Sequence, residues 1–331
     1  MTGAIEKVTC VGCGVIGAGW VVHFLRAGLD VVACDPDPSK EAYVRTMIED
    51  AWPHVTSLGL ADGASPDRWR FSTTLEDAIP EADLVQESAV ENEAMKIDLL
   101  KRIDDLAKDD AIIASSSSGF LAARLRTEMA GGDRFLIAHP FNPPYMIPLV
   151  ELAGADGLAA GVLDRITEFY RSTEMRPVVL NREIRGYIGN RIQAAVFREV
   201  LHIVQEGVAS PEDIDAAIKY GPGLRWALMG PTEIYSLGSG GGEGWSFFLK
   251  LLLGELADGY AAPGSFEPSE ATLQRYTAGA MQALDRAPFQ RLCNQRDDGL
   301  VKLRNLISDL DRAQASQPAE QRAQRRCPLP L

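Results

Sequence analysis

The glycine-rich segment at residues 12–17, Gly-Cys-Gly-Val-Ile-Gly, constrains the fold of this chain more than any other feature. It begins where a short apolar run at 8–11 ends, and it opens a segment with helical spacing at 16–28. In such a strand–turn–helix unit, the three glycines permit a tight turn, close approach of a pyrophosphate and close packing of helix on strand. We therefore predict that a dinucleotide binds at the N-terminus of the first helix. The predicted cofactor-binding residues of this segment are Gly12, Gly14, Val15, Ile16 and Gly17.

Asp35 follows the second predicted strand and indicates which dinucleotide is bound. Its carboxylate can accept hydrogen bonds from the adenosine ribose hydroxyls, and it would repel a 2′-phosphate. The next residues, 36–38, supply no arginine to neutralise such a phosphate. The predicted cofactor is therefore NAD rather than NADP, and the alternative is a structural glycine turn with an incidental acid. Cys13, in the same loop, is interpreted as a small packing residue rather than a reactive thiol.

The alternation of short apolar runs with helical segments predicts a doubly wound α/β fold in the first half of the chain. Strands are predicted at 8–11, 30–34, 82–86, 111–115, 134–138, 148–152 and 176–180, with helices at 16–28, 39–60, 92–108, 120–130 and 157–173. After Gly186 only helices are predicted, at about 187–207, 211–220, 245–258, 270–285 and 297–314. We predict a Rossmann-type NAD-binding domain at 1–184, an all-α substrate and dimerisation domain at 185–315, and a loose tail at 316–331.

Composition narrows the class of protein. The content of 46% hydrophobic and 24% charged residues is that of a globular protein. A net charge of −13 argues against nucleic acid as a partner. No apolar run reaches the roughly 18 residues of a membrane span, and the N-terminus lacks the pattern of a secretory signal. Five cysteines, an odd number, favour reduced thiols and a cytoplasmic location.

Of the four histidines, His139 has the setting of an acid/base group. It ends a predicted strand at the carboxyl side of the sheet, where open α/β proteins bind ligands. The prolines of the segment 139–144, His-Pro-Phe-Asn-Pro-Pro, hold it rigid and out of any helix. Glu151 lies in the apolar run at 149–152, where a carboxylate needs a partner. We therefore predict that His139 and Glu151 form a pair, and no metal site is predicted.

These motifs together resemble the 3-hydroxyacyl-CoA dehydrogenase superfamily over about residues 7–240. The matching features are the glycine loop, Val90-Glu91-Asn92 with Lys96, the serines at 115–118, the segment 139–143, Glu151 and Gly186-Tyr187-Ile188-Gly189-Asn190-Arg191. One departure is the run of four serines at 115–118, which stands where the family has Ser-Asn-Thr-Ser and keeps the last serine.

The resemblance implies roles for the matching residues. His139 would be the general base for a substrate hydroxyl, and Glu151 would orient and support it. Ser118 and Asn190 would hydrogen-bond the substrate oxygen. Glu91 and Lys96 would lie near the nicotinamide ribose. Alcohol oxidation needs such a base, and it needs donors for the charge that develops on the oxygen.

The segment 221–231 resembles the branch that includes L-carnitine dehydrogenase and L-gulonate 3-dehydrogenase (lambda-crystallin), which act on free acids. Residues 39–70 contain basic side chains that could hold a CoA phosphate. Several acids accompany them, so this segment does not indicate a CoA site. The predicted reaction is NAD-dependent oxidation of the 3-hydroxyl of a small free hydroxy acid, with L-carnitine converted to 3-dehydrocarnitine. Arg225 could pair with the carboxylate, and Trp226 or Tyr145 could face the quaternary ammonium. The alternative is that Arg225 and Trp226 only pack at a helix junction.

Other functions remain open from the sequence. L-gulonate or another 3-hydroxy acid could be the substrate, and so could a 3-hydroxyacyl-CoA. A crystallin-like structural role is the alternative without catalysis, although retention of the four residues implied to act on the substrate speaks against it. We also expect a homodimer formed mainly by the helical domain, because its helices carry more apolar surface than a small layer can bury.

Overall fold

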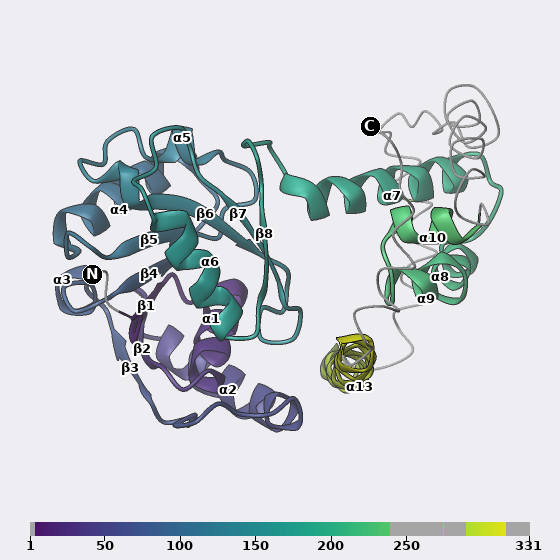
Figure 1. Ribbon diagram of the computed structural model, residues 1–331, viewed down its shortest axis with the longest axis horizontal. Coiled ribbons are helices and arrows are strands. Elements are labelled where there is room, and N and C mark those ends of the chain that lie inside the picture. The colour runs from purple at the N-terminus through teal and green to yellow at the C-terminus, as the bar shows by residue number, and fades with distance from the viewer. Residues whose placement is uncertain (1–3, 239–273, 275–288, 316–331) are drawn as a thin grey trace. The chain divides into compact units, whose positions relative to one another are not determined.

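The computed structural model describes residues 4–238, 274 and 289–315 (Figure 1). The chain divides into two compact units, Met1–Arg191 and Ile192–Leu331. The division falls inside helix α7 (Tyr187–Gln205), a few residues beyond the domain boundary expected at residue 184. The predicted helices at 245–258 and 270–285 and the tail at 316–331 lie outside the described residues.

The first unit contains one eight-stranded sheet with the order β3-β2-β1-β4-β5-β6-β7-β8. Its strands are β1 (Lys7–Val11), β2 (Asp30–Cys34), β3 (Trp69–Ser72), β4 (Leu84–Glu87), β5 (Ile112–Ser115), β6 (Phe135–Pro140), β7 (Leu149–Ala153) and β8 (Arg176–Val179). Neighbouring strands are parallel except β6 and β7, which are antiparallel. The strand order reverses between β1 and β4, and ligands bind at such switch points. The predicted α/β fold is confirmed.

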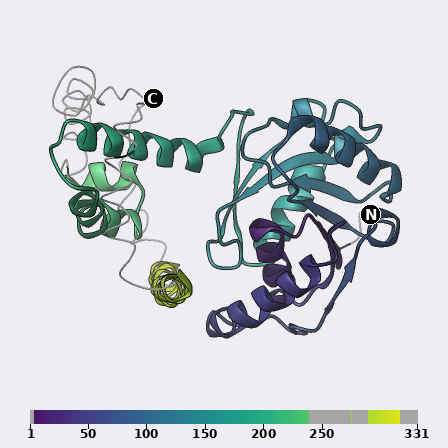
Figure 2. The ribbon, with the colours of Figure 1, turned by 180° about the vertical axis from the view of Figure 1, so that it is seen from behind.

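Helices cover both faces of this sheet, as the two opposite views show (Figures 1 and 2). They are α1 (Val15–Arg26), α2 (Lys40–Ser57), α3 (Leu75–Ala78), α4 (Glu93–Leu106), α5 (Ala122–Leu125) and α6 (Val162–Ser172), with a 3₁₀ turn at Gly132–Arg134. The helix predicted at 120–130 is only the single turn of α5. Strand β3 was not predicted, because it is an edge strand in which only Ser72 is buried and the apolar pattern is weak.

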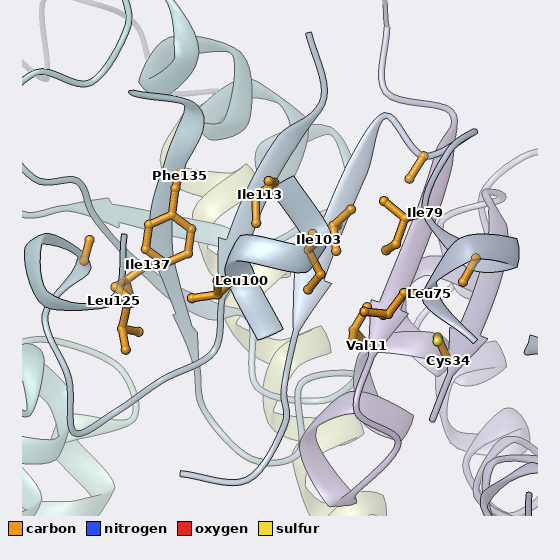
Figure 3. Close-up of a cluster of buried hydrophobic side chains, with 14 of the residues drawn as sticks. Val11, Cys34, Leu75, Ile79, Leu100, Ile103, Ile113, Leu125, Phe135 and Ile137 are labelled. Atoms are coloured by element: carbon orange, nitrogen blue, oxygen red, sulfur yellow. The ribbon is translucent and has the colours of Figure 1, made fainter. Parts of the chain in front are cut away.

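A core cluster lies between the sheet and the helices α3, α4 and α5 (Figure 3). Leu100 and Ile103 of α4 meet strand residues such as Ile113 and Phe135 there. The strand residues come from neighbouring parallel strands that are buried on both faces, so these strands read as nearly continuous apolar runs. This core holds the carboxyl ends of the strands in place.

The described part of the second unit is helical. It comprises the remainder of α7, α8 (Pro211–Tyr220), α9 (Pro222–Trp226), α10 (Pro231–Gly238) and α13 (Phe289–Ala315). Val200 and Val204 of α7 pack with Ile214 of α8 in a small core. The fold class therefore matches the prediction of an α/β domain followed by a helical one. Among the described residues, no helix combines the length and apolar character that crossing a membrane requires.

Candidate active site

The antiparallel pairing of β6 with β7 places His139 directly opposite Glu151. Side chains at opposite positions of an antiparallel pair are cross-strand neighbours on the same face. His139 Nδ1 lies 3.0 Å from Glu151 Oε2, and both side chains are buried. Because a carboxylate only accepts hydrogen bonds, the proton of this bond resides on Nδ1. The two residues that the sequence suggested as partners are therefore in direct contact.

The second carboxylate oxygen of Glu151 accepts hydrogen bonds from the N-terminus of α7. Its Oε1 lies 2.8 Å from the backbone nitrogen of Ile188 and 3.1 Å from that of Gly189. A carboxylate at this end of a helix satisfies unpaired N–H groups and interacts favourably with the helix dipole. Burial opposes ionisation of Glu151, but the hydrogen bonds from His139 and from these two backbone groups outweigh it. The pKa of Glu151 therefore lies below its usual value.

The other ring nitrogen of His139 is contacted by Asn190, from the first turn of α7. Asn190 Nδ2 lies 3.3 Å from His139 Nε2. With its proton on Nδ1, the neutral imidazole has a lone pair at Nε2, where it accepts from the amide. His139 is thereby held in the tautomer that a general base requires, with Nε2 as the basic nitrogen.

Two aromatic rings that the sequence reasoning did not single out flank this histidine. The ring centroids of Tyr187 and Phe141 lie 5.1 Å and 5.7 Å from that of His139. The Tyr187 hydroxyl donates to the carbonyl oxygen of Phe120 at 2.7 Å, and burial raises its pKa. A side chain at Gly189 would place its Cβ 2.2 Å from the Phe141 ring, so any larger residue there would have to displace that ring. Both aromatic residues lie within the motifs that carry the resemblance, and this was the available signal.

The turn that carries Ser118 is held by Glu91. Glu91 Oε1 accepts from the Ser117 hydroxyl at 2.7 Å and from the backbone nitrogens of Ser118 and Gly119 at 3.1 and 2.7 Å. Glu91 therefore positions the backbone of Ser118. Its other oxygen lies 3.5 Å from Lys96 Nζ.

Lys96 is bound to a carboxylate that sequence reasoning missed. Its Nζ lies 2.7 Å from Oε1 of Glu87, the last residue of β4, and both side chains are almost fully buried. Glu87 also accepts from the Ser115 hydroxyl and from the backbone nitrogen of Ala89. The position of Glu87 at the end of an apolar strand was the signal for this pair. Contact of Glu91 and Lys96 with the nicotinamide ribose stays a prediction.

The glycine loop has the shape that a dinucleotide requires. Gly12 has φ of +88°, and a Cβ there would come within 2.7 Å of the backbone nitrogen of Ala89. A Cβ at Gly17 would come within 1.8 Å of the Gly12 carbonyl oxygen, whereas one at Gly14 would meet open space. Gly14 is the N-cap of α1 and offers no side chain to its first-turn N–H groups. These groups, Val15 and Ile16 among them, fit a pyrophosphate.

A cavity of about 690 Å³ adjoins this loop. Gly12, Gly14, Asp35, Ser88 and Lys96 are among its lining residues. The Asp35 carboxylate accepts from the backbone nitrogens of Cys13 at 2.8 Å and of Asp37 at 3.0 Å. Asp35 thus holds the glycine loop while presenting its negative charge to the cavity. The donor set and the open space at Gly14 fit NAD.

The two cysteines of this region are spaced Cys10-x-x-Cys13, but both are free and buried. Burial, reinforced by the nearby Asp35 charge, raises the pKa of the Cys13 thiol to about 12. At neutral pH the thiol stays protonated, so it is unreactive. This supports the interpretation of Cys13 as a small packing residue.

The residues expected to bind the two ends of the substrate lie in different units. Tyr145 is in the first unit and only 5% exposed, so little of its ring is available to a ligand. Arg225 and Trp226 are on α9 in the second unit, and both are exposed. Within the described ranges, no cluster of three or more histidine, cysteine or acidic side chains could hold a metal ion.

Known proteins match this chain along most of its length. Residues 7–184 match the NAD binding domain of 3-hydroxyacyl-CoA dehydrogenase, and residues 186–283 match its C-terminal domain. L-Carnitine dehydrogenase of Bacillus cereus is 41% identical over 304 residues, which cover 92% of this chain and 93% of that protein. L-Carnitine dehydrogenase of Streptomyces coelicolor is 41% identical over 299 residues, covering 90% and 94%.

Solved structures agree with these matches. The NAD+-dependent 5-formyl-3-hydroxy-2-methylpyridine 4-carboxylic acid 5-dehydrogenase superimposes with a TM-score of 0.79 at 27% identity, covering 92% of this chain and 99% of that one. (S)-3-Hydroxybutyryl-CoA dehydrogenase from Ralstonia eutropha gives a TM-score of 0.62 at 27% identity, covering 83% and 95%. With both family models matched in order and the His139–Glu151 pair in place, this chain belongs to the 3-hydroxyacyl-CoA dehydrogenase family and is an NAD-dependent dehydrogenase.

Proposed function

We propose that this protein oxidises the 3-hydroxyl of L-carnitine to give 3-dehydrocarnitine. The observation that carries the reaction is the oriented set of Glu151, His139 and Asn190 at the carboxyl edge of the sheet. The relatives named L-carnitine dehydrogenase, at about 40% identity over nearly the whole of both chains, support the choice of substrate.

The geometry indicates how the side chains act on the hydroxyl. Nε2 of His139 takes the hydroxyl proton, and Glu151 stabilises the imidazolium that forms through the bond at Nδ1. The Asn190 amide, 3.3 Å from Nε2, is placed to donate to the same substrate oxygen, and Ser118 is the second donor we assign. The glycine loop and Asp35 would hold NAD, which would supply the hydride acceptor for C3. In the reverse direction His139 returns the proton.

Two of the basic residues near the early helices, Arg68 and Arg70, are poorly suited to hold a CoA phosphate. Arg68 pairs with Asp30 at 2.9 Å, and Arg70 lies 2.5 Å from Asp77. Paired guanidinium groups leave less attraction for an added phosphate. The higher TM-score with a dehydrogenase of a free pyridine carboxylic acid than with the 3-hydroxybutyryl-CoA enzyme agrees with a free acid as substrate.

The two charged ends of carnitine require an anion site and a cation site. Arg225 is our candidate for the carboxylate, because a guanidinium can bind it with two parallel hydrogen bonds. Trp226 is 46% exposed and offers its ring to the trimethylammonium group. Neighbouring helical residues point in different directions, so the two residues need separate tests. Tyr145, with its 5% exposure, is the weaker candidate for the cation.

A substrate screen tests the reaction directly. NADH formation is followed with L-carnitine, L-gulonate, 3-hydroxybutyrate and 3-hydroxybutyryl-CoA at equal concentrations. We expect the highest kcat/KM with L-carnitine. A higher value with the CoA thioester or with gulonate would overturn the carnitine proposal, and no turnover with any of them would favour the crystallin-like alternative.

Substitution of Trp226 tests the cation site. A cation–π contact at an exposed ring contributes about 0.5–1 kcal/mol, so Trp226→Ala should raise KM for L-carnitine roughly two- to fivefold. The KM for 3-hydroxybutyrate, which lacks the quaternary ammonium group, should change less. Tyr220→Ala, at an exposed aromatic residue of the same unit, is the matched control. Equal effects on both substrates would show that Trp226 is structural.

We further propose a cytoplasmic homodimer. Large apolar side chains are exposed in the described part of the second unit, including Val208, Leu224 and Leu228. A second copy of the chain would cover such surface. A monomeric mass by light scattering at micromolar concentration would contradict the dimer. The free thiols of Cys10 and Cys34 agree with a reducing compartment, which cell fractionation checks.

A further inference from the structure

Three basic side chains line the dinucleotide cavity, and two of them already have a carboxylate partner. Lys96 pairs with Glu87 at 2.7 Å, and Arg102 lies 3.8 Å from Glu76. Among the described residues, no carboxylate lies within 4.0 Å of the third, Lys40. Its Nζ lies 5.4 Å from the centroid of the Tyr43 ring, and its charge contributes to lowering the pKa of the exposed Asp37. Lys40 is thus the cation of this cavity that is available to an anion.

Lys40 lies close in sequence to Asp35, the acid that we expect to select the cofactor. It is the first residue of α2, and the short link 35–39 joins it to the end of β2. Lys40 and Asp35 both line the cavity. Both charges also act on Cys13, because Asp35 raises the pKa of that thiol while Lys40 lowers it. The two residues therefore act on the same end of the cavity with opposite charge.

We propose that Lys40 determines cofactor specificity together with Asp35: the carboxylate excludes a 2′-phosphate on the adenosine ribose, and Lys40 would bind that phosphate if the charge at position 35 were removed. The inference rests on the NAD-binding domain and is independent of the carnitine proposal. It goes beyond repulsion by Asp35, because it assigns an attractive partner to the phosphate of NADP.

Loss of repulsion alone would not make the cavity a good phosphate site. A phosphate that enters it gives up part of its hydration, and this loss is compensated only by charge or hydrogen bonds. A lysine ammonium binds phosphate as a point charge and needs no bidentate geometry. The gain in NADP binding on neutralising Asp35 should therefore depend on Lys40.

A double-mutant cycle measures this dependence. The wild type, Asp35→Asn, Lys40→Met and the double variant are titrated with NADPH and NADH, and binding is read from nucleotide fluorescence. The asparagine oxygen can still accept from one of the two backbone nitrogens that Asp35 binds. Asp35→Ser is the second choice if that variant is poorly folded, as judged by its unfolding temperature. Lys101→Met, on an exposed lysine of α4 paired with Asp105, is the matched control.

We expect Asp35→Asn to tighten NADPH binding at least tenfold. Adding Lys40→Met should remove about tenfold of the affinity for NADPH, the equivalent of one charge-assisted hydrogen bond, and change NADH binding less than about twofold. The contribution of Lys40 should also shrink as salt is raised. An unchanged NADPH affinity on adding Lys40→Met would overturn the proposal. Equal losses for NADH and NADPH would also overturn it, because Lys40 would then serve the diphosphate that both share.

Discussion

Two buried glutamates, Glu87 and Glu151, occupy similar positions but have different basic partners. Each lies on a strand, is at most 1% exposed, and binds one basic side chain together with at least one backbone N–H group. Glu87 binds Lys96, whose side chain is enclosed in the first unit. Glu151 binds His139, whose second ring nitrogen meets the amide of Asn190.

The difference lies in what the basic partner can still do. The Lys96 ammonium only donates hydrogen bonds, and its carboxylate neighbours take them. An imidazole has two distinct nitrogens, so Glu151 can hold one of them while the other takes and returns a proton. We therefore expect a buried carboxylate to stabilise the fold when its partner is lysine and to support proton transfer when its partner is histidine. We expect Glu87 substitutions to act on stability and Glu151 substitutions to act on turnover.

The largest effect is expected for His139→Gln. Loss of the general base should lower kcat by about 10³- to 10⁴-fold, because no other group would take the hydroxyl proton. NADH affinity should change little, since the imidazole acts on the substrate hydroxyl. Steady-state kinetics and fluorescence titration measure the two quantities. His54→Gln, on a helix distant in sequence from the pair, is the control, and near-normal turnover by His139→Gln would refute the assigned role.

Glu87→Gln should produce the next largest effect, on stability. Removing one partner of a buried ion pair leaves an uncompensated charge, and the free energy of unfolding should fall by about 3 kcal/mol. The double variant Glu87→Gln/Lys96→Met should recover part of this loss, because both charges are gone. Chemical denaturation measures it, with Glu81→Gln in the exposed pair with Lys7 as control. If Glu87→Gln is as stable as wild type, the pair does not stabilise the fold as expected.

Glu151→Gln should lower kcat by about 10²-fold, less than the loss of the base itself. A glutamine has one acceptor oxygen, so it cannot accept from both His139 Nδ1 and the backbone nitrogens of Ile188 and Gly189. Its NH₂ group would face a hydrogen-bond donor on one of these two sides, and that hydrogen bond would be lost. The imidazolium would also lose its anionic neighbour. Kinetics with L-carnitine measure the effect on turnover, and NADH titration measures the effect on cofactor binding. A fall in NADH affinity that equals the fall in kcat would place Glu151 with the cofactor instead.

The smallest effect concerns the pH dependence of stability. The folded-state pKa of Glu151 lies below its ordinary value, so its ionised form stabilises the fold above the unfolded-state pKa. The ordinary pKa of glutamate is about 4.3, and the folded-state pKa of Glu151 lies below it. The contribution is therefore lost as the pH falls through the folded-state pKa. The difference in unfolding free energy between wild type and Glu151→Gln should therefore shrink on acidification from pH 6. A constant difference would mean that the carboxylate is not held in its ionised form.

Much of the first unit could be predicted because its signals are local. The glycine spacing at 12–17 specifies a tight turn between strand and helix, whatever the rest of the chain does. His139 and Glu151 are only 12 residues apart, at the two ends of a short connection, so their pairing was accessible to sequence reasoning. Strand β3 was missed because an edge strand buries little and leaves a weak apolar pattern.

Contacts between segments far apart in the sequence could not be predicted in this way. Asn190 meets His139 across 51 residues. This contact depends on where α7 begins, which is at Tyr187, and both Tyr187 and the preceding Gly186 have positive φ. The partner of Lys96 and the availability of Lys40 follow from which side chains surround them in three dimensions. The sequence by itself determined the glycine loop, the fold class and the contact of His139 with Glu151, because turn geometry and hydrophobic periodicity act over short stretches of chain. Only the tertiary structure decided which charges are already neutralised and which nitrogen of His139 is basic, because both depend on neighbours that folding brings together.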